Sequence, residues 1–251
     1  TIEFTSSGLG KLEIARTNSP DLQVEVTFAA TIVNLGFAID HSGSILDTLA
    51  NPHYTLQKTG LANALALIPT DDANVQYNVS VITFGADVKT LVPPTILTAG
   101  NLADVQNKIT SHVRTNTSAT HTGTAIKELT DLFSGSLDRL TLFNISTDGT
   151  PSGGLHPEST SAAAFAAGVD GISFELVGSF GTSAINRMRS LAGPGDVQYF
   201  SDPADLPDPT KKGFVFEVDS FDDYEAAISA KVQKIVDVTN PSPIPLPASL
   251  P

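Results

Sequence analysis

The stretch Leu35-Gly-Phe-Ala-Ile-Asp-His-Ser-Gly-Ser44 joins an apolar run to an acid and two hydroxyls. The run Leu35–Ile39 is typical of a buried β-strand, and the residues that follow the stretch favour a helix. Asp40, Ser42 and Ser44 alternate along the connection, and a glycine between the two serines lets the backbone turn. Three oxygen donors on one loop suit Mg²⁺ or Ca²⁺. The stretch therefore predicts a strand, a turn and a cation-binding loop.

Length, charge and composition limit the class of protein. The chain has 251 residues, enough to bury a large core as one α/β domain with or without an appendage. Its formal net charge of -13 argues against nucleic acid and against anionic lipid, which both bind basic surfaces. A cation, or a partner that presents one, suits this charge better, although acidity can also serve solubility alone. There is no cysteine, so disulfides are excluded, and no run of about 18 apolar residues predicts a membrane-spanning helix.

Both ends of the chain favour an exported protein. The first residue is Thr1 rather than methionine, which fits a removed signal peptide or a trimmed chain. Residues 240–251 are Pro-rich and predict an extended tail. The part Ile244-Pro-Leu-Pro-Ala-Ser-Leu-Pro251 resembles the start of the PEP-CTERM sorting signals (VPLPA type) of Gram-negative bacteria. This resemblance implies a secreted, extracellular or cell-surface bacterial protein, attached to a membrane only through a C-terminal segment that has been removed.

The hydrophobic pattern divides the chain into three parts. Residues 1–32 alternate apolar and polar residues, which predicts an N-terminal β extension of two or three strands. Residues 33–239 alternate strands with helices, which predicts an α/β fold with a doubly wound, mostly parallel sheet flanked by helices. Residues 240–251 are the tail.

Within the central part, we expect six strands and six helices. The strands are Leu35–Ile39, Val75–Phe84, Asp87–Val92 (paired with Val75–Phe84 as a hairpin), Leu140–Ile145, Ile172–Val177 and Val197–Phe200. The helices are Leu46–Leu67 (interrupted near Pro52), Leu102–Ile109, Thr124–Phe133, Ser159–Ala167, Ala184–Leu191 and Tyr224–Val238. Phe214-Val-Phe216 also alternates like a strand, or simply packs in the core.

Two later loops carry the same kinds of side chain as the first. Ala119-Thr-His-Thr-Gly-Thr124 is rich in hydroxyls and opens onto a helix. Leu142-Phe-Asn-Ile-Ser-Thr-Asp148 is a buried strand that ends in an acid, with Gly149 after it. Because ligands of α/β sheets bind at the carboxyl ends of the strands, we expect all three loops to meet there.

Together, these three loops resemble the metal-ion-dependent adhesion site, or MIDAS, of the von Willebrand factor A family. The family pattern is Asp-x-Ser-x-Ser in the first loop, a Thr in the second and an Asp in a Thr-Asp-Gly-like third loop. The resemblance covers about residues 33–238 and implies that this part is a von Willebrand factor A (VWA) domain. It implies five metal ligands, with Thr122 as the alternative to the threonine: Asp40, Ser42, Ser44, Thr120 and Asp148.

The resemblance also implies a cofactor and a partner. One Mg²⁺ or Ca²⁺ ion would bind at the site, and an Asp or Glu carboxylate of a protein partner, possibly another copy of this chain, would complete its shell. Two carboxylates offset the charge of a cation, whereas three hydroxyls add oxygens without neutralising it further, so the metal would remain electrophilic. In some domains of the family the last helix, here Tyr224–Val238, shifts with affinity.

Other polar residues have weaker claims to a role. His41 and His121 flank proposed ligands and could line the rim of the site or bind metal, although an oxygen site does not need them. The remaining histidines, His53, His112 and His156, are expected at the surface. The acids Asp47, Asp71, Asp72, Asp222 and Asp223 are expected as solvated groups at helix ends, or alternatively as a second calcium site.

Two functional hypotheses follow, and catalysis is disfavoured. The first is an exported adhesion or protein-binding module that depends on a cation. The second is a structural subunit of a surface assembly or filament, in which the terminal segments reach a neighbour by strand addition. An enzyme is disfavoured because there is no Gly-x-Ser-x-Gly elbow, no Gly-x-x-x-x-Gly-Lys loop, no zinc-hydrolase pairing of histidines and no evident general base.

Overall fold

A single mixed sheet organises the part of the chain that the computed structural model describes, residues 30–115 and 117–240. Its strand order is β3-β2-β1-β4-β5-β7-β6, and every neighbouring pair is parallel except the hairpin of β2 with β3. The strands are β1 (Thr31–Asp40), β2 (Val75–Phe84), β3 (Val88–Ile96), β4 (Thr141–Thr147), β5 (Gly171–Val177), β6 (Tyr199–Phe200) and β7 (Val215–Val218). The expected α/β fold with a mostly parallel sheet is confirmed.

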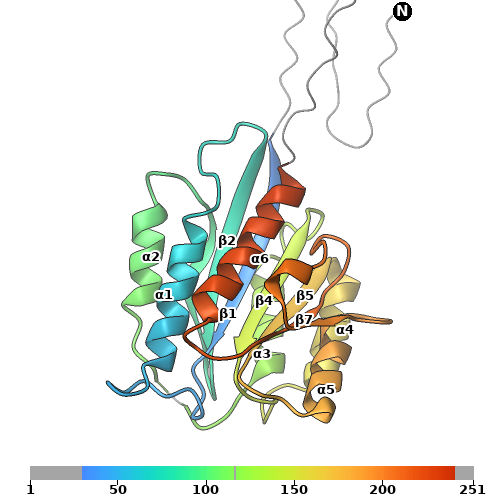
Figure 1. Ribbon diagram of the computed structural model, residues 1–251. Helices are drawn as coiled ribbons and strands as arrows, with labels where there is room; N and C mark the ends of the chain where they lie inside the picture. The colour runs from blue at the N-terminus through green and yellow to red at the C-terminus, as the bar shows by residue number, and fades with distance from the viewer. Residues whose placement is uncertain (1–29, 116, 241–251) are drawn as a thin grey trace, which may run out of the picture.

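Helices cover both faces of this sheet (Figure 1). One face carries α1 (His53–Leu65), α2 (Leu102–Thr110) and α6 (Tyr224–Thr239), and the other carries α3 (Thr122–Leu132), α4 (Pro157–Ala167) and α5 (Thr182–Ala192). A short 3-10 helix spans Pro203–Asp205. None of the helices in the described ranges is both long and apolar enough to cross a bilayer.

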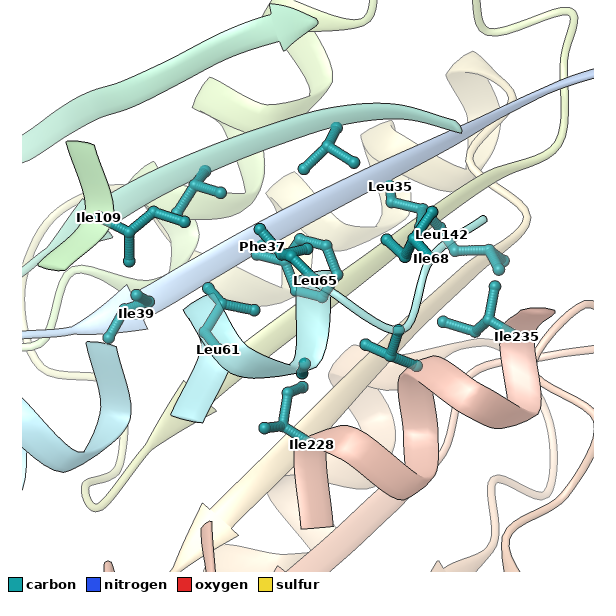
Figure 2. Close-up of a cluster of buried hydrophobic side chains, with 14 of the residues drawn as sticks. Leu35, Phe37, Ile39, Leu61, Leu65, Ile68, Ile109, Leu142, Ile228 and Ile235 are labelled. Atoms are coloured by element: carbon teal, nitrogen blue, oxygen red, sulfur yellow. The ribbon is translucent and has the colours of Figure 1, made fainter. Parts of the chain in front are cut away.

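The central strands are apolar because both of their faces are covered. Leu35, Phe37 and Ile39 of β1 pack under α1 and α6, as Figure 2 shows. The intervening Ala38 belongs to the second core, on the other face, with Phe143 and Ile145 of β4. A helix pair on the first face approaches closely at Gly60, where an added Cβ would lie 3.0 Å from the Cα of Glu225.

One buried ion pair links the last helix to the sheet. Lys231 of α6 donates a short hydrogen bond to Glu175 of β5, and both side chains are almost fully buried. Burial raises the pKa of Glu175 and lowers that of Lys231, and the charge of each opposes the effect on the other. A second link joins the hydroxyls of Tyr224 and Ser146 at 2.8 Å. The last helix is therefore fixed to strands β4 and β5.

Several expected elements need correction. The helix expected at Leu46–Leu67 begins only at His53, because the proline at position 52 interrupts the helical pattern and residues 46–52 form a loop. Asp47 accepts hydrogen bonds from the backbone and hydroxyl of Thr55. The strand expected at Val197–Phe200 is limited to Tyr199–Phe200, whereas the alternation at Phe214–Phe216 does form β7.

One of the acids expected at a helix end has another role. Asp72 precedes β2 and accepts hydrogen bonds from the backbone of Asn74 and Val75 and from the side chain of Asn240. Asp223 does lie at a helix end, directly before α6. The strands expected before residue 30 and residues 241–251 of the tail lie outside the described residues.

Candidate metal centre

The first and third proposed loops leave adjacent strands of the sheet. In the pairing of β1 with β4, Ile39 lies opposite Ser146, so Asp40 and Thr147 come next on each strand. Asp148 follows directly. Both strands end at the lower edge of the sheet in Figure 1. The register of a parallel strand pair therefore brings two carboxylates, 108 positions apart by residue number, to one edge.

Asp40 is fully buried and its two oxygens are separately held. The backbone N–H of Ser42 donates to Oδ1 at 2.7 Å, and the hydroxyl of Thr147 donates to Oδ2 at 2.5 Å. One bond comes from the loop after β1 and the other from the end of β4. These two hydrogen bonds fix the orientation of the carboxylate before any ligand binds.

A chain of oxygen atoms connects the first loop to the third. The hydroxyl of Ser44 donates to Oδ1 of Asp148 at 2.5 Å, and the Oγ atoms of Ser44 and Ser42 are 3.3 Å apart. Asp148 is more exposed than Asp40. The structure therefore groups the four proposed ligands of these two loops in one hydrogen-bonded cluster.

Thr120, in the second loop, lies beside this cluster. A Cβ built on Gly149 would be 3.5 Å from Oγ1 of Thr120 and 3.8 Å from Oγ of Ser44, so the glycine lies close to both. The backbone N–H of Thr120 donates to the hydroxyl of Ser152 at 3.0 Å, and the N–H of Ser152 returns a bond to the carbonyl of Thr120 at 3.0 Å. The loop after β4 thus holds the second loop in place.

Thr122 stays an alternative to Thr120. Its hydroxyl is buried and has no hydrogen-bond partner among the described residues. Thr122 opens α3, one residue after His121. The choice between the two threonines as a metal ligand remains a prediction.

The charges of the two carboxylates are coupled. Burial raises the pKa of Asp40 to about 6, and the negative charge of Asp148 adds to this, against the hydrogen bonds from Thr147 and Ser42. Burial also raises the pKa of Asp148, while the hydrogen bond from Ser44 lowers it. Both acids therefore lie in surroundings where a positive charge would favour their ionised forms.

The donor atoms fit a hard divalent cation. The group offers two carboxylates and hydroxyls, with no sulfur, as Mg²⁺ and Ca²⁺ prefer. No group of three or more His, Cys, Asp or Glu side chains that could hold a metal occurs within residues 30–115 and 117–240. A cation here would depend on hydroxyl oxygens as well as on the two carboxylates.

The histidines beside the ligands face other groups. Nε2 of His41 is 3.2 Å from Oδ1 of Asp87, at the end of the β2–β3 hairpin. The ring of His121 lies against the loop after β4, about 2.9 Å from a Cβ that Gly153 would carry. Both rings therefore lie against the edges of the site.

His112 corrects an expectation of surface exposure. Its ring is buried, and Nδ1 is 2.6 Å from the hydroxyl of Tyr54. Lys58 donates to the carbonyl of His112 at 2.6 Å. Burial lowers the pKa of His112 to about 4, so the ring is neutral near pH 7. Nothing local in the sequence marks this position, because its partners come from α1.

Two further residues support the site and were missed in the sequence. Thr147 precedes the acid of the third loop, and its contact with Asp40 depends on the pairing of β1 with β4. Arg114 donates from Nη2 to the carbonyl of Ser42 at 2.9 Å. The charge of Arg114 also lowers the pKa of Asp148. The position of Thr147 directly before Asp148, in the Thr-Asp-Gly-like loop, could have indicated its supporting role. Arg114 lies in a loop without a recognisable pattern.

Cation binding is expected to weaken below about pH 6. Because burial raises the pKa of Asp40 to about 6, protons compete with the cation there, and affinity should fall up to tenfold for each unit below that value. Titration calorimetry with Mg²⁺ between pH 5 and pH 8 measures this. An Mg²⁺ affinity that stays the same between pH 5 and pH 8 would contradict this prediction.

The same shift has the opposite effect on the cation-free protein. Between the unfolded value of 3.8 and about 6, the folded state binds a proton at Asp40 that the unfolded state does not, so this residue's contribution to stability falls as pH rises. The excess stability of Asp40→Asn over the wild type in EDTA should therefore shrink as pH falls through 6.

A family model of the von Willebrand factor type A domain matches residues 34–229 of this chain. The match includes all three proposed loops. Comparison with curated protein sequences gives no match.

Solved structures with the same fold come from animals and bacteria. Proximal thread matrix protein 1 from the mussel byssus has a TM-score of 0.61 and 20% identity, over 84% of this chain and 49% of that one. A form of it with a zinc-occupied MIDAS motif has a TM-score of 0.56 and 18% identity, over 82% and 47%. This chain thus spans about half the length of the mussel protein.

Two bacterial structures are also similar. The conserved hypothetical protein BatB from Bacteroides thetaiotaomicron has a TM-score of 0.56 and 18% identity, over 82% of this chain and 98% of that one. The pilus adhesin SpaC from Lactobacillus rhamnosus GG has a TM-score of 0.57 and 14% identity, over 83% and 30%. At these identities the likeness establishes the fold.

Proposed function

The chain belongs to the von Willebrand factor type A domain family, and we propose that it is a cation-dependent protein-binding module of the adhesion type. One observation carries the proposal. Oxygen atoms from separate loops, those of Asp40, Ser44 and Asp148, lie in one hydrogen-bonded group at the carboxyl edge of the sheet. Among the similar structures, the mussel byssus protein has a form with a zinc-occupied MIDAS motif.

Five side chains would hold one Mg²⁺ or Ca²⁺ ion: Asp40, Ser42, Ser44, Thr120 and Asp148. When bound, the ion supplies an electrophilic centre that a carboxylate from outside can approach. The protein's own part is to fix the oxygens in advance. Thr147 and the backbone of Ser42 orient Asp40, and Ser44 orients Asp148.

The surface around this group suits a protein partner. Five large apolar side chains are exposed among the described residues, and four of them lie on loops of the same edge: Leu46, Leu49, Val113 and Leu155. Leu46 and Leu49 follow the first proposed loop. Val113 is next to Arg114, which binds the carbonyl of Ser42, and the N–H of Leu155 donates to Thr124. Apolar side chains around a charged centre are typical of a protein interface.

Binding is favoured over catalysis by the surroundings of the carboxylates. Oxygens of Asp40 and Asp148 already accept hydrogen bonds from hydroxyls, and His41 faces Asp87. Within the described residues, these three side chains are therefore held by neighbouring groups, as suits a fixed binding site. The partner class that we propose is a protein that presents an Asp or Glu carboxylate, with a second copy of this chain as one candidate, at the surface of a bacterial cell.

Binding to an immobilised carboxylate peptide tests this function. The sensor surface carries a flexible Gly-Ser peptide with one Glu flanked by Leu, and the reference surface carries Gln in place of Glu. We expect binding in 5 mM Mg²⁺ (a concentration of the order that saturates exposed oxygen sites) to the Glu surface and a loss of at least about tenfold in EDTA. Equal binding to both surfaces, or binding unchanged by EDTA, would contradict the proposal.

A further inference from the structure

A cavity of about 350 Å³ lies beside the candidate metal centre. Its walls come from the start of α1, the end of β5 and the connection from β7 to α6. The lining residues that matter here are His53, Val177, Asp219, Phe221 and Asp222. Its size is within the range of sites that bind small groups.

The register of the sheet places this cavity next to Asp148. Thr147 of β4 pairs with Leu176 of β5, so Asp148 and Val177 are the next residues along adjacent strands. His53 forms another wall of the cavity. A segment that reaches the metal centre would therefore pass the mouth of the cavity.

The walls of the cavity suit a positive charge. Asp219 and Asp222 are exposed, and neither has a hydrogen bond or ion pair with another described residue. The ring of Phe221 stacks on that of His53, with centroids 4.3 Å apart and planes 13° apart. Stacked rings next to free carboxylates are a favourable environment for an ammonium or guanidinium group.

The neighbouring helix ends do not reverse this preference. The N-termini of α1 and α6 border the cavity, and each contributes about half a positive charge. Two acidic side chains, Asp219 and Asp222, line the cavity together with one histidine, His53, and no Lys or Arg does. The side chains at its mouth are therefore predominantly acidic, which favours a positively charged group.

We infer that this cavity binds a Lys or Arg side chain of the segment whose carboxylate reaches the metal centre, so that the recognised segment carries an acid and a base. The inference rests on the proposed function for the identity of the acid. Binding of the basic side chain depends only on the cavity and does not require the metal. The partner is thereby narrowed from any exposed carboxylate to an acid with a basic residue a few positions away.

The first test uses a fragment and does not involve the metal. We follow the backbone amide resonances of residues 177–178 and 219–222 while n-butylguanidinium is added in EDTA, with n-butylurea as the neutral control. We expect saturable shifts with the guanidinium, at least about fivefold weaker binding of the urea and about fivefold weaker guanidinium binding in Asp219→Asn/Asp222→Asn.

A matched double variant controls for charge alone. Asp71 and Asp138 are exposed, lie at the opposite edge of the sheet and likewise lack a described partner. Asp71→Asn/Asp138→Asn should bind the guanidinium as the wild type does. Equal binding of the urea, absence of shifts in these residues, or equal weakening in both double variants would overturn the inference.

The second test links the cavity to the metal centre. Peptides with one Glu and one Arg separated by one, two or three Gly residues are compared with the same peptides carrying citrulline for Arg, in Mg²⁺ and in EDTA. At least one spacing should bind several-fold more tightly with Arg, and Asp219→Asn/Asp222→Asn should remove that advantage without changing Mg²⁺ affinity. Peptide affinities that EDTA leaves unchanged, with the Arg advantage retained, would sink the metal function and keep the cavity, whereas Mg²⁺-dependent binding with no Arg advantage at any spacing would sink the cavity alone.

Discussion

Asp40→Asn is expected to abolish specific binding of Mg²⁺ and Ca²⁺. The substitution keeps the shape of the side chain but removes the charge of the more buried of the two carboxylates at the proposed site. Loss of an outer-shell partner of a metal commonly costs 10–100-fold in affinity, so loss of a charged ligand should exceed about 100-fold. Titration calorimetry measures the affinity directly.

Thermal unfolding separates this effect from misfolding. Because burial raises the pKa of Asp40 to about 6, Asp40→Asn should be at least as stable as the wild type in EDTA at pH 7. Mg²⁺ at 100 times its dissociation constant should stabilise the wild type by about 2.7 kcal/mol and leave the variant unchanged.

Two control variants should have smaller effects on Mg²⁺ affinity than Asp40→Asn. Asp138→Asn, exposed at the opposite edge, should retain wild-type affinity. Thr147→Val removes the hydroxyl that donates to Asp40 and should weaken binding by roughly 10–100-fold. Retention of Mg²⁺-dependent stabilisation in Asp40→Asn would show that the cation binds elsewhere.

Lys231→Met is expected to destabilise the fold by about 3–5 kcal/mol. The side chains of Lys231 and Glu175 are almost fully buried, and the variant leaves the carboxylate of Glu175 without its partner. Its remaining hydrogen bond, from the hydroxyl of Ser146 at 3.3 Å, is long. Urea unfolding at pH 7 measures the loss as a shift of the midpoint with an unchanged slope.

Two matched variants make this result specific to the pair. Lys234→Met is on the same helix and its side chain has no ion pair among the described residues, so it should change stability by less than about 0.5 kcal/mol. Glu175→Leu/Lys231→Met removes both charges and should recover most of the stability lost in Lys231→Met. A double variant no more stable than the single one would mean that packing, rather than the unpaired charge, causes the loss.

Much of the fold follows from the sequence because the central strands must be apolar on both faces. Leu35–Ile39 is such a run, Leu142–Ile145 is one apart from the buried Asn144, and both lie within strands at the centre of the sheet. The ends of helices that depend on a single residue, such as Pro52 before α1, were less predictable. Leu46 and Leu49 belong to the expected helix Leu46–Leu67, yet both are exposed, and the helix begins after Pro52.

The candidate site shows the same division. Asp40, Ser42, Ser44 and Asp148 could be named because each follows a recognisable strand, and the order of parallel strands brings their loops together. The contributions of Arg114 and Thr147 could not, because they depend on contacts between loops and between adjacent strands. Likewise, the sequence has no local pattern that would place His112 against Tyr54.

The central position of β1 has a mechanical consequence for a protein that holds a partner under tension. Thr31 begins the strand at one edge of the sheet, where Thr31 and Asn240 both bond to residues 72–74, and Asp40 ends it at the edge that carries the site. A pull between a partner at Asp40 and the chain before Thr31 would run along this strand. Because β2 pairs with all ten of its residues and β4 pairs from Asn34 to Ile39, such a load would act on the hydrogen bonds in shear, many at once, rather than peeling them apart singly.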